Sequence, residues 1–295
     1  MKKLVIFGVG LIGGSVALAL KKASGTNPAL QIVGVGRSST SLQAALELGV
    51  IDLASSDIAT ALKDADMVLI ATPVAQTSAI LQSIKPHLNA STVITDAGST
   101  KGDVLRCADE ILGAQFNQFI GGHPIAGAER SGVTAAKADL YLNKNVVLTP
   151  TPTTSKQAIL TATQLWQACG ANVSEMPAAM HDSIFAAVSH LPHLLAFALV
   201  DDIASRPNAA ELFGFAASGF RDFTRIAGSH PEMWRDITLA NKNALLSELT
   251  AYQTELATVK TLLENEDGAG LNALFERASV ARNAWALGHP TKVEI

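Results

Sequence analysis

The sequence predicts an α/β protein, with a mostly parallel, doubly wound sheet at the N-terminus and an all-helical domain after it. Three observations lead to this fold class. A short apolar run, a glycine-rich turn and a helical pattern follow one another at the start of the chain. Short β-branched segments then alternate with helical patterns up to about residue 175, and strand-like segments stop after Pro177. Such alternation is typical of a parallel sheet with helices on both faces.

The first predicted strand, residues 3–7, leads into a Gly-x-Gly-x-x-Gly turn. In this fingerprint Gly8 allows the tight turn, Gly10 lets a pyrophosphate approach the backbone, and Gly13 lets helix and strand pack closely. The helix that begins around Leu11 and Ile12 offers free N–H groups and a positive dipole end to the phosphates. The pattern predicts a Rossmann-type dinucleotide-binding domain over residues 1–175.

Further strands are predicted at residues 31–35, 67–71, 92–96, 145–148 and 172–174, with helices that include 77–85 and 102–112. Ligands bind outside the carboxyl ends of such strands, where Thr72, Pro73 and residues 96–99 are expected. Residues 176–295 are predicted to be helical. Leucines recur at three-to-four spacing from Leu245 to Leu263, and we expect them to serve core packing and dimerisation.

The end of the second predicted strand favours NADP over NAD. NAD-preferring domains carry an acid ~20 residues past the fingerprint, where it bonds the ribose hydroxyls. Here Arg37, Ser38, Ser39 and Thr40 follow the strand, and no acid occurs before Glu47. Arg37 and the hydroxyls of Ser38 and Ser39 suit a 2′-phosphate, which a carboxylate would repel. A compatible alternative is that Ser39 or Thr40 caps the next helix.

Composition narrows the class of protein. The 295 residues are 48% hydrophobic and 16% charged, with a formal net charge of -4. These values predict a soluble globular chain of about two domains and give no sign of nucleic-acid or membrane binding. The apolar stretch 184–200 contains His190, Pro192 and His193. It is therefore expected to be a buried helical region rather than a membrane span.

We expect a cytoplasmic protein. Lys2 and Lys3 before an apolar run superficially resemble a signal peptide, but cleavage there would delete the first strand and the fingerprint. Cys107 and Cys169, the two cysteines, are far apart in segments with a helical pattern. This spacing predicts buried thiols rather than a disulfide framework or a metal site.

Residues 121–129, Gly-Gly-His-Pro-Ile-Ala-Gly-Ala-Glu, contain the most distinctive catalytic candidate, His123. Pro124 lacks an N–H and restricts His123, so the segment is expected to be neither an ordinary helix nor a central strand. The glycines let a ligand or another backbone come close. A rigidly held histidine suits proton abstraction. The alternative is a loop histidine that only caps or hydrogen-bonds.

A second polar cluster occurs in the helical half. His190 and His193 flank a proline, and Arg221 and Arg225 follow a turn rich in glycine and alanine. The planar guanidinium binds carboxylates through two parallel hydrogen bonds, so an anionic organic acid is the expected ligand. A lone histidine on an apolar helix is more often a core residue, but this grouping favours a site. No metal is expected, because no carboxylate or cysteine occurs at ligand spacing beside these histidines.

Together these motifs resemble the prephenate/arogenate (cyclohexadienyl) dehydrogenase family of tyrosine biosynthesis. The resemblance covers most of the chain: the fingerprint and the segments 96–101, 122–127, 189–193 and 219–225. It implies a Rossmann domain followed by a helical dimerisation domain, with the site in the cleft between them and a homodimer as the assembly. It also implies oxidative decarboxylation of arogenate or prephenate, with hydride transfer to NADP or NAD.

The resemblance also implies roles for individual residues. His123 would take the proton from the ring hydroxyl, and Ser99 would hydrogen-bond both that hydroxyl and His123. Arg225 would bind the side-chain carboxylate. The remaining matched positions around the pocket are His190, His193, Arg221, Glu129 and Trp234. Because loss of carbon dioxide makes the reaction irreversible, the protein need only position the partners and accept a proton.

Two other functions stay open on the sequence. A β-hydroxyacid dehydrogenase or imine reductase usually depends on a catalytic lysine or an imine-binding helix, and the Gly-His-Pro segment argues against both. A non-catalytic NADP-sensing module would leave His123, His193 and Arg225 without a purpose. Prephenate and arogenate differ only in a keto group against an ammonium, and the sequence does not decide between them.

Overall fold

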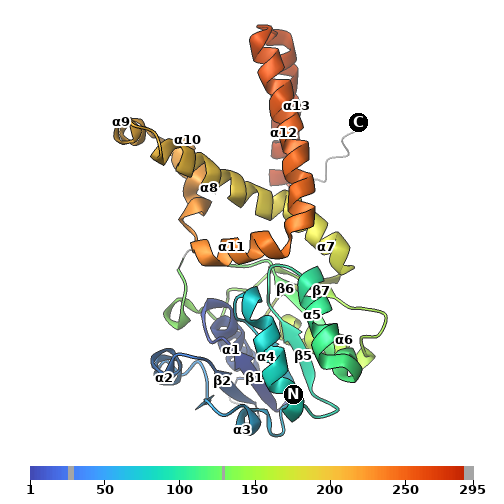
Figure 1. Cartoon of the computed structure of the whole chain (residues 1–295). Helices are drawn as coiled ribbons and strands as arrows, with labels where there is room; N and C mark the ends of the chain where they lie inside the picture. Colours follow the sequence, from blue (N-terminus) through green and yellow to red (C-terminus); the bar gives the residue numbers. More distant parts are fainter. Residues whose placement is uncertain (26–29, 128–129, 289–295) are drawn as a thin grey trace. The chain divides into compact units, whose positions relative to one another are not determined.

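The computed structural model describes residues 1–25, 30–127 and 130–288. The chain forms two compact units, Met1–Leu245 and Leu246–Ile295. An eight-stranded sheet lies at the centre of the first unit, in the order β3-β2-β1-β4-β5-β6-β7-β8 (Figure 1). Its strands are Lys3–Phe7 (β1), Gln31–Val35 (β2), Leu53–Ser55 (β3), Met67–Ile70 (β4), Val93–Asp96 (β5), Phe119–Pro124 (β6), Asn145–Thr149 (β7) and Asn172–Glu175 (β8).

Neighbouring strands pair in parallel, except for the antiparallel pair β6 and β7. The strand order reverses at β1, which lies between β2 and β4. In an open α/β sheet, the crevice at such a reversal is where ligands bind. The five strands predicted after β1 are confirmed to within one residue. The short edge strand β3 and the strand β6 were not predicted.

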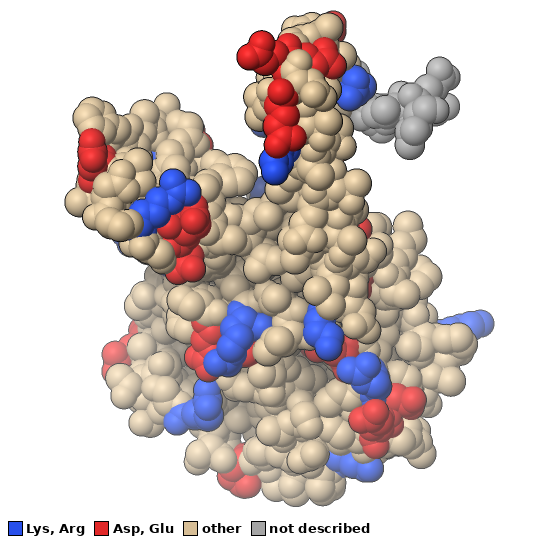
Figure 2. All heavy atoms as spheres, turned by 45° about the horizontal axis from the view of Figure 1, so that its top comes forward, with Lys and Arg blue, Asp and Glu red and all other residues tan. Residues whose placement is uncertain are grey.

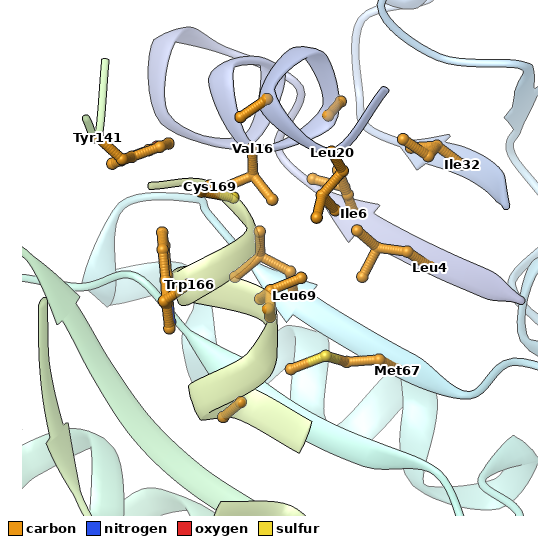
Figure 3. Packing of buried hydrophobic residues seen from close by; sticks show 14 of the residues in the cluster. Leu4, Ile6, Val16, Leu20, Ile32, Met67, Leu69, Tyr141, Trp166 and Cys169 are labelled. Atoms are coloured by element: carbon orange, nitrogen blue, oxygen red, sulfur yellow. The ribbon is translucent and has the colours of Figure 1, made fainter. Parts of the chain in front are cut away.

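Helices cover both faces of the sheet, because alternate side chains of each strand point to opposite faces. On one face Leu4 and Ile6 pack with Val16 of α1 (Leu11–Ser24) and Trp166 of α6 (Lys156–Ala168), as Figure 3 shows. The second core contains the β1 residues Val5 and Phe7 and side chains of α3 (Ile58–Leu62), α4 (Thr77–Ile84) and α5 (Gly102–Leu112). Helix α2 (Ser39–Glu47) contributes to the first core.

Strand β6 corrects the expectation that the Gly-Gly-His-Pro segment is not a central strand. It lies between β5 and β7. Pro124, which has no backbone N–H, is the last residue of the strand, so only the end of the hydrogen-bond ladder lacks a donor. The two glycines let its neighbours pack closely. A Cβ on Gly121 would lie 2.4 Å from Oγ1 of Thr149, and one on Gly122 would lie 2.7 Å from the carbonyl oxygen of Asp96.

Both cysteines are free thiols. Cys169 is buried, and burial raises its pKa to about 12. Cys107 on α5 is only partly buried, which corrects the expectation for that residue. On the face drawn in Figure 2, grey residues aside, Lys and Arg alternate with Asp and Glu rather than forming one extended basic surface.

After β8 the described chain is helical, as predicted. Helix α7 (Ala178–Phe185) continues through a π-helical turn, Ala186–His190, into α8 (Leu191–Ala204). Pro192 has no N–H to bond to the preceding turn, which suits this widened geometry. Three more α-helices lie wholly in this unit: α9 (Ala209–Gly214), α10 (Ser218–Thr224) and α11 (Pro231–Ala240).

The stretch Ala178–Ala204 meets the length and composition of a membrane span, with a mean hydropathy of 1.7. It lies outside the first 25 residues, and only 28% of its most apolar window is buried. The expectation of a buried helical region over 184–200 is therefore wrong for the single chain. Its apolar surface is available to a partner.

The second unit is a hairpin of two long helices, α12 (Lys242–Glu264), which begins in the first unit, and α13 (Gly268–Ala286) (Figure 1). Asp267 caps α13 by accepting the N–H of Gly270 at 2.8 Å. Of the leucine stripe on α12, only Leu245 is buried. The exposed large apolar residues of the hairpin include Leu246, Leu256, Leu263, Phe275, Val280 and Trp285. The stripe is therefore not a core feature of the single chain.

Candidate functional site

The glycine-rich turn forms part of a groove at the carboxyl ends of β1, β2 and β4. Gly8 has a φ of +91°, and a Cβ there would lie 2.7 Å from the carbonyl oxygen of Ala71. A Cβ on Gly13 would lie 2.3 Å from the carbonyl oxygen of Gly8, so both positions require glycine. Gly10 has no atom within 4 Å of an ideal Cβ, and it directly precedes Leu11, the first residue of α1. The turn therefore leaves an open approach to the N–H groups of a helix N-terminus.

This groove has a volume of about 930 Å³, and six of the predicted cofactor residues line it: Gly8, Gly10, Arg37, Ser38, Thr72 and Pro73. Oγ1 of Thr72 is buried and has no hydrogen-bond partner among the described residues. A bound dinucleotide would supply one, so the residues present fit such a cofactor. Ile12 and Gly13 belong to the adjoining first turn of α1 rather than to the lining.

Ser38 has two functions in this region. It lines the groove, and its Oγ accepts the N–H of Ser41 at 3.2 Å, which caps α2. The capping residue is thus Ser38 and not Ser39 or Thr40. Ser39 is the first residue of α2 and is exposed; it is not among the lining residues.

His123 lies near the end of β6 and contacts α7. Its Nδ1 is 2.8 Å from Nε2 of His181, and its ring packs edge-on against Phe185 with centroids 4.7 Å apart. Burial lowers the pKa of His123 well below its ordinary value, and electrostatic interactions with His181, Lys101 and His190 lower it further. His123 is therefore neutral at neutral pH, which is the form that can accept a proton.

His181 in turn contacts Asp182, with Nδ1 2.8 Å from Oδ1. The same carboxylate accepts the backbone N–H of Lys101 at 2.9 Å and of Gly102 at 2.7 Å, where α5 begins. Burial alone would raise the pKa of Asp182, but the hydrogen bonds from His181, Gly102 and Lys101 hold it below its ordinary value. A continuous series of hydrogen bonds thus joins the start of α5 to His123.

Sequence reasoning missed His181 and Asp182. Their one signal is an adjacent His-Asp pair just after the last strand. His123 and His181 are 58 residues apart in the chain, and the fold brings them together by packing α7 against β7, the neighbour of β6, and against α5.

Ser99 lies in the loop after β5, and this loop is fixed by a buried ion pair. Asp96 pairs with the ammonium of Lys101, and both side chains are almost completely buried. The Asp96 carboxylate also accepts the N–H of Gly98 at 2.8 Å and of Gly122 at 3.0 Å, next to His123. Within the described chain no hydrogen bond joins Ser99 to His123, so that expected contact is not formed in this structure.

A second cavity, of about 680 Å³, contains the predicted carboxylate-binding residues His193 and Arg225. It is also lined by Arg130 and Lys137, from the segment between β6 and β7, which were not predicted. Basic groups from distant parts of the chain therefore converge on one cavity, as an anionic substrate requires. Arg221 is exposed on α10 and is not among its lining residues. Glu129 lies outside the described residues.

His193 and Trp234 form a stacked pair beside this cavity, with ring centroids 3.6 Å apart and planes 20° apart. Nδ1 of His193 donates to the carbonyl oxygen of Ser189 at 2.9 Å, which leaves Nε2 as an acceptor. Nε1 of Trp234 is a buried donor without a partner among the described residues. The pair therefore contains one acceptor and one buried, unpartnered donor.

His190 is part of the helical framework. Its Nδ1 is 3.0 Å from the amide nitrogen of Asn241, which also donates to the carbonyl oxygen of Asp182 at 2.8 Å. Since an amide nitrogen only donates, Nδ1 of His190 is an acceptor. Burial lowers the pKa of His190 to about 4. Among the described residues, no group of three or more His, Cys, Asp or Glu side chains is arranged to hold a metal ion.

Known proteins resemble this chain over nearly its whole length. A family model described as the nucleotide-binding domain of prephenate dehydrogenase matches residues 16–175, and one described as its dimerization domain matches residues 177–277. Prephenate dehydrogenase of Bacillus subtilis is 41% identical over 286 residues, which are 96% of this chain and 76% of that protein.

Two solved structures extend the comparison. Prephenate dehydrogenase of Aquifex aeolicus, in complex with hydroxyphenyl propionate and NAD+, superposes with a TM-score of 0.89 at 37% identity and covers 96% of this chain and 97% of that one. Arogenate dehydrogenase of Synechocystis superposes with a TM-score of 0.81 at 29% identity, over 96% of this chain and 99% of that one.

Proposed function

Because the chain belongs to the prephenate dehydrogenase family, we propose that it oxidatively decarboxylates prephenate or arogenate with His123 as the general base. It is an NAD(P)-dependent oxidoreductase of tyrosine biosynthesis. Family membership favours this function over a hydroxyacid or imine reductase and over a nucleotide sensor. The observation that supports the base is a neutral ring whose Nδ1 contacts His181, which leaves Nε2 for the substrate.

The proton of the ring hydroxyl passes to Nε2 of His123 as the carbonyl forms. A bound nicotinamide supplies the acceptor for the hydride that leaves the same carbon. The bond to the ring carboxylate then breaks, its electron pair enters the ring, and carbon dioxide leaves. The aromatic product is a phenolate at this point, and the proton held by His123 returns to its oxygen. His123 is thereby neutral again for the next turnover.

We place the substrate's side-chain carboxylate at Arg225, beside His193. Both residues line the 680 Å³ cavity, and a guanidinium can bind a carboxylate through two hydrogen bonds. The unpartnered Nε1 of Trp234 supports a further donor to the substrate. Ser99 is assigned to the ring hydroxyl. His190 acts from the framework, through Asn241.

We propose NADP as the preferred cofactor, although the Aquifex aeolicus structure contains NAD+. Strand β2 ends at Val35, and the groove-lining residues that follow it into α2 are Gly36, Arg37, Ser38, Ser41 and Leu42, with no carboxylate among them. Replacing Arg37 by alanine should weaken NADP binding by about 1.5–3 kcal/mol, the value of a hydrogen bond to a charged group, and spare NAD. Titration of both cofactors checks this, and unchanged NADP affinity would remove Arg37 from the assignment.

We also propose a homodimer. The second half of the chain matches a dimerization domain, the α12–α13 hairpin exposes large apolar side chains, and much of the apolar surface of α8 is only partly buried. The cytoplasmic location stays a prediction from the sequence.

The assay that tests the function combines prephenate and arogenate with NAD and NADP, two by two. We expect reduced nicotinamide to appear with at least one of the two substrates, faster with NADP. Nucleotide binding without turnover of either substrate would refute the proposed activity.

A further inference from the structure

The hydrogen bonds between α5 and His123 determine which ring nitrogens carry protons. Both oxygens of Asp182 accept backbone N–H groups, and a carboxylate with a lowered pKa is ionised and only accepts. Nδ1 of His181, 2.8 Å from Oδ1, must therefore be the protonated nitrogen.

The same reasoning continues to the catalytic ring. Burial lowers the pKa of His181, so the ring is neutral and a proton on Nδ1 leaves a lone pair on Nε2. Nε2 of His181 lies 2.8 Å from Nδ1 of His123, so Nδ1 must be the donor to this lone pair. His123 is also neutral, so its Nε2 carries the lone pair. Nε2 is the nitrogen that the proposed chemistry requires as the base.

We propose that His181 and Asp182 are positioning residues that hold His123 in the tautomer with a basic Nε2. This inference rests on the function proposed for His123. The Asp182 charge also stabilises the imidazolium that forms at His123 when it takes the proton, through the intervening ring of His181. A similar tautomeric control operates in the Ser-His-Asp triad, where the carboxylate contacts the histidine directly.

Asp182 also has a structural role, because it accepts the two N–H groups at the start of α5. A variant of Asp182 would therefore remove the hydrogen bonds at the start of α5 together with the control of the tautomer, and the two effects would not be separated. Among the described residues, the side chain of His181 makes no hydrogen bond to the backbone of α5, so His181 is the better residue to change.

Two substitutions separate the roles of His181. His181→Leu fills much of the space but offers no acceptor to Nδ1 of His123. His181→Gln can place an amide oxygen near the position of Nε2 and accept the same hydrogen bond. We expect His181→Leu to lower kcat by between ~10-fold and ~10⁴-fold. The lower limit is typical of losing a residue that orients a functional histidine, and the upper limit is typical of a catalytic histidine in the wrong tautomer. KM should change by less than about threefold, since substrate binding lies elsewhere. His181→Gln should recover most of the loss.

A spectroscopic readout is independent of turnover. In protein labelled with ¹⁵N-histidine, two-bond ¹H–¹⁵N correlations distinguish Nδ1–H from Nε2–H rings, and the His123→Asn variant assigns the His123 signals. We expect Nδ1–H for His123 in the parent and in His181→Gln, and a population of Nε2–H in His181→Leu. The exposed His87, replaced by leucine, is the matched control and should change neither kcat nor the His123 signals.

The outcomes are distinct. A parent His123 that is Nε2–H, or a His181→Leu variant with parental kcat and tautomer, would overturn the proposal. So would equal loss in His181→Leu and His181→Gln with the His123 tautomer unchanged, which would mean a packing role only. Failure of the proposed function is recognised separately, because the parent would then turn over neither cyclohexadienyl substrate.

Discussion

At the scale of single residues, the environment of His123 has two opposing effects. A lowered pKa keeps the ring neutral and available, but it also makes the ring a weaker proton acceptor. The nearby ammonium of Lys101 adds to this weakness. The carboxylate of Asp182, one ring away, favours the imidazolium and offsets part of it. The site therefore combines availability at neutral pH with support for the charge that develops during the reaction.

Replacing His123 by asparagine should lower kcat by roughly 10²- to 10⁴-fold, the usual contribution of a general base, because asparagine keeps a hydrogen-bonding shape but cannot take the proton. Cofactor affinity, measured by fluorescence titration, should stay close to that of the parent. The parent's kcat/KM should fall only on the acid side of pH ~6.5, since the pKa of His123 is lowered from that ordinary value. Near-normal turnover of the variant would show that another group is the base.

Arg225→Ala should mainly raise KM. The side-chain carboxylate is unchanged by the reaction, so its contact contributes equally to the ground state and the transition state. Loss of a charge-assisted hydrogen bond is worth about 1.5–3 kcal/mol, or roughly 10- to 150-fold in KM. Steady-state kinetics together with a melting curve check this. An ordinary KM in a variant that melts much earlier would assign Arg225 to structure instead.

At the scale of secondary-structure elements, the sequence was most informative where local chemistry decides the conformation. The strand, glycine turn and helix of residues 3–24 were predicted from their sequence pattern, and in the structure Gly8 and Gly13 each occupy a position that admits no side chain. Strand β6 was not, because glycine and proline have low strand propensity and only its tight fit against β5 and β7 makes them suitable. The contact between His123 and His181 depends on tertiary packing, so no local pattern signals it.

Gly122→Ala should damage both stability and activity. Its Cβ would lie 2.7 Å from the backbone carbonyl oxygen of Asp96, which cannot move aside like the end of a flexible side chain. Overpacking of this kind costs about 1–3 kcal/mol, and the shift of β6 would displace His123. Urea denaturation and kcat measure the two effects. Gly214→Ala, at the end of α9 with no atom within 4 Å of its Cβ, is the control and should change stability by less than ~0.5 kcal/mol.

At the scale of the whole molecule, the pKa values of four histidines are shifted in the same direction. Burial lowers the pKa of His123, His181, His190 and His193 alike. The unfolded chain has no such burial, so its histidines titrate near the ordinary pKa of ~6.5. Burial therefore keeps His123 neutral and available as a base, and the same burial makes the stability of the fold sensitive to acid.

The free energy of unfolding should accordingly fall as the pH drops below about 6.5. In that range the unfolded chain binds protons that the folded chain resists, and the effect continues towards the folded pKa of His190, about 4. The lowered pKa of Asp182 adds a stabilisation that is complete above its unfolded value of 3.8 and is lost only as the pH falls below that value, outside this window. Urea denaturation at pH 7.5, 6 and 5 measures the slope. Stability that stays constant down to pH 5 would contradict the four shifts taken together.

The buried pair of Asp96 and Lys101 also constrains how related sequences can diverge. Removing one partner leaves the other charge buried and uncompensated, at a cost of about 3–5 kcal/mol. That is a large share of the 5–15 kcal/mol by which a typical domain is stable. Selection should therefore remove single substitutions at either position, and a change at one position should appear only together with a change at the other. In an alignment of relatives, positions 96 and 101 should covary as a unit.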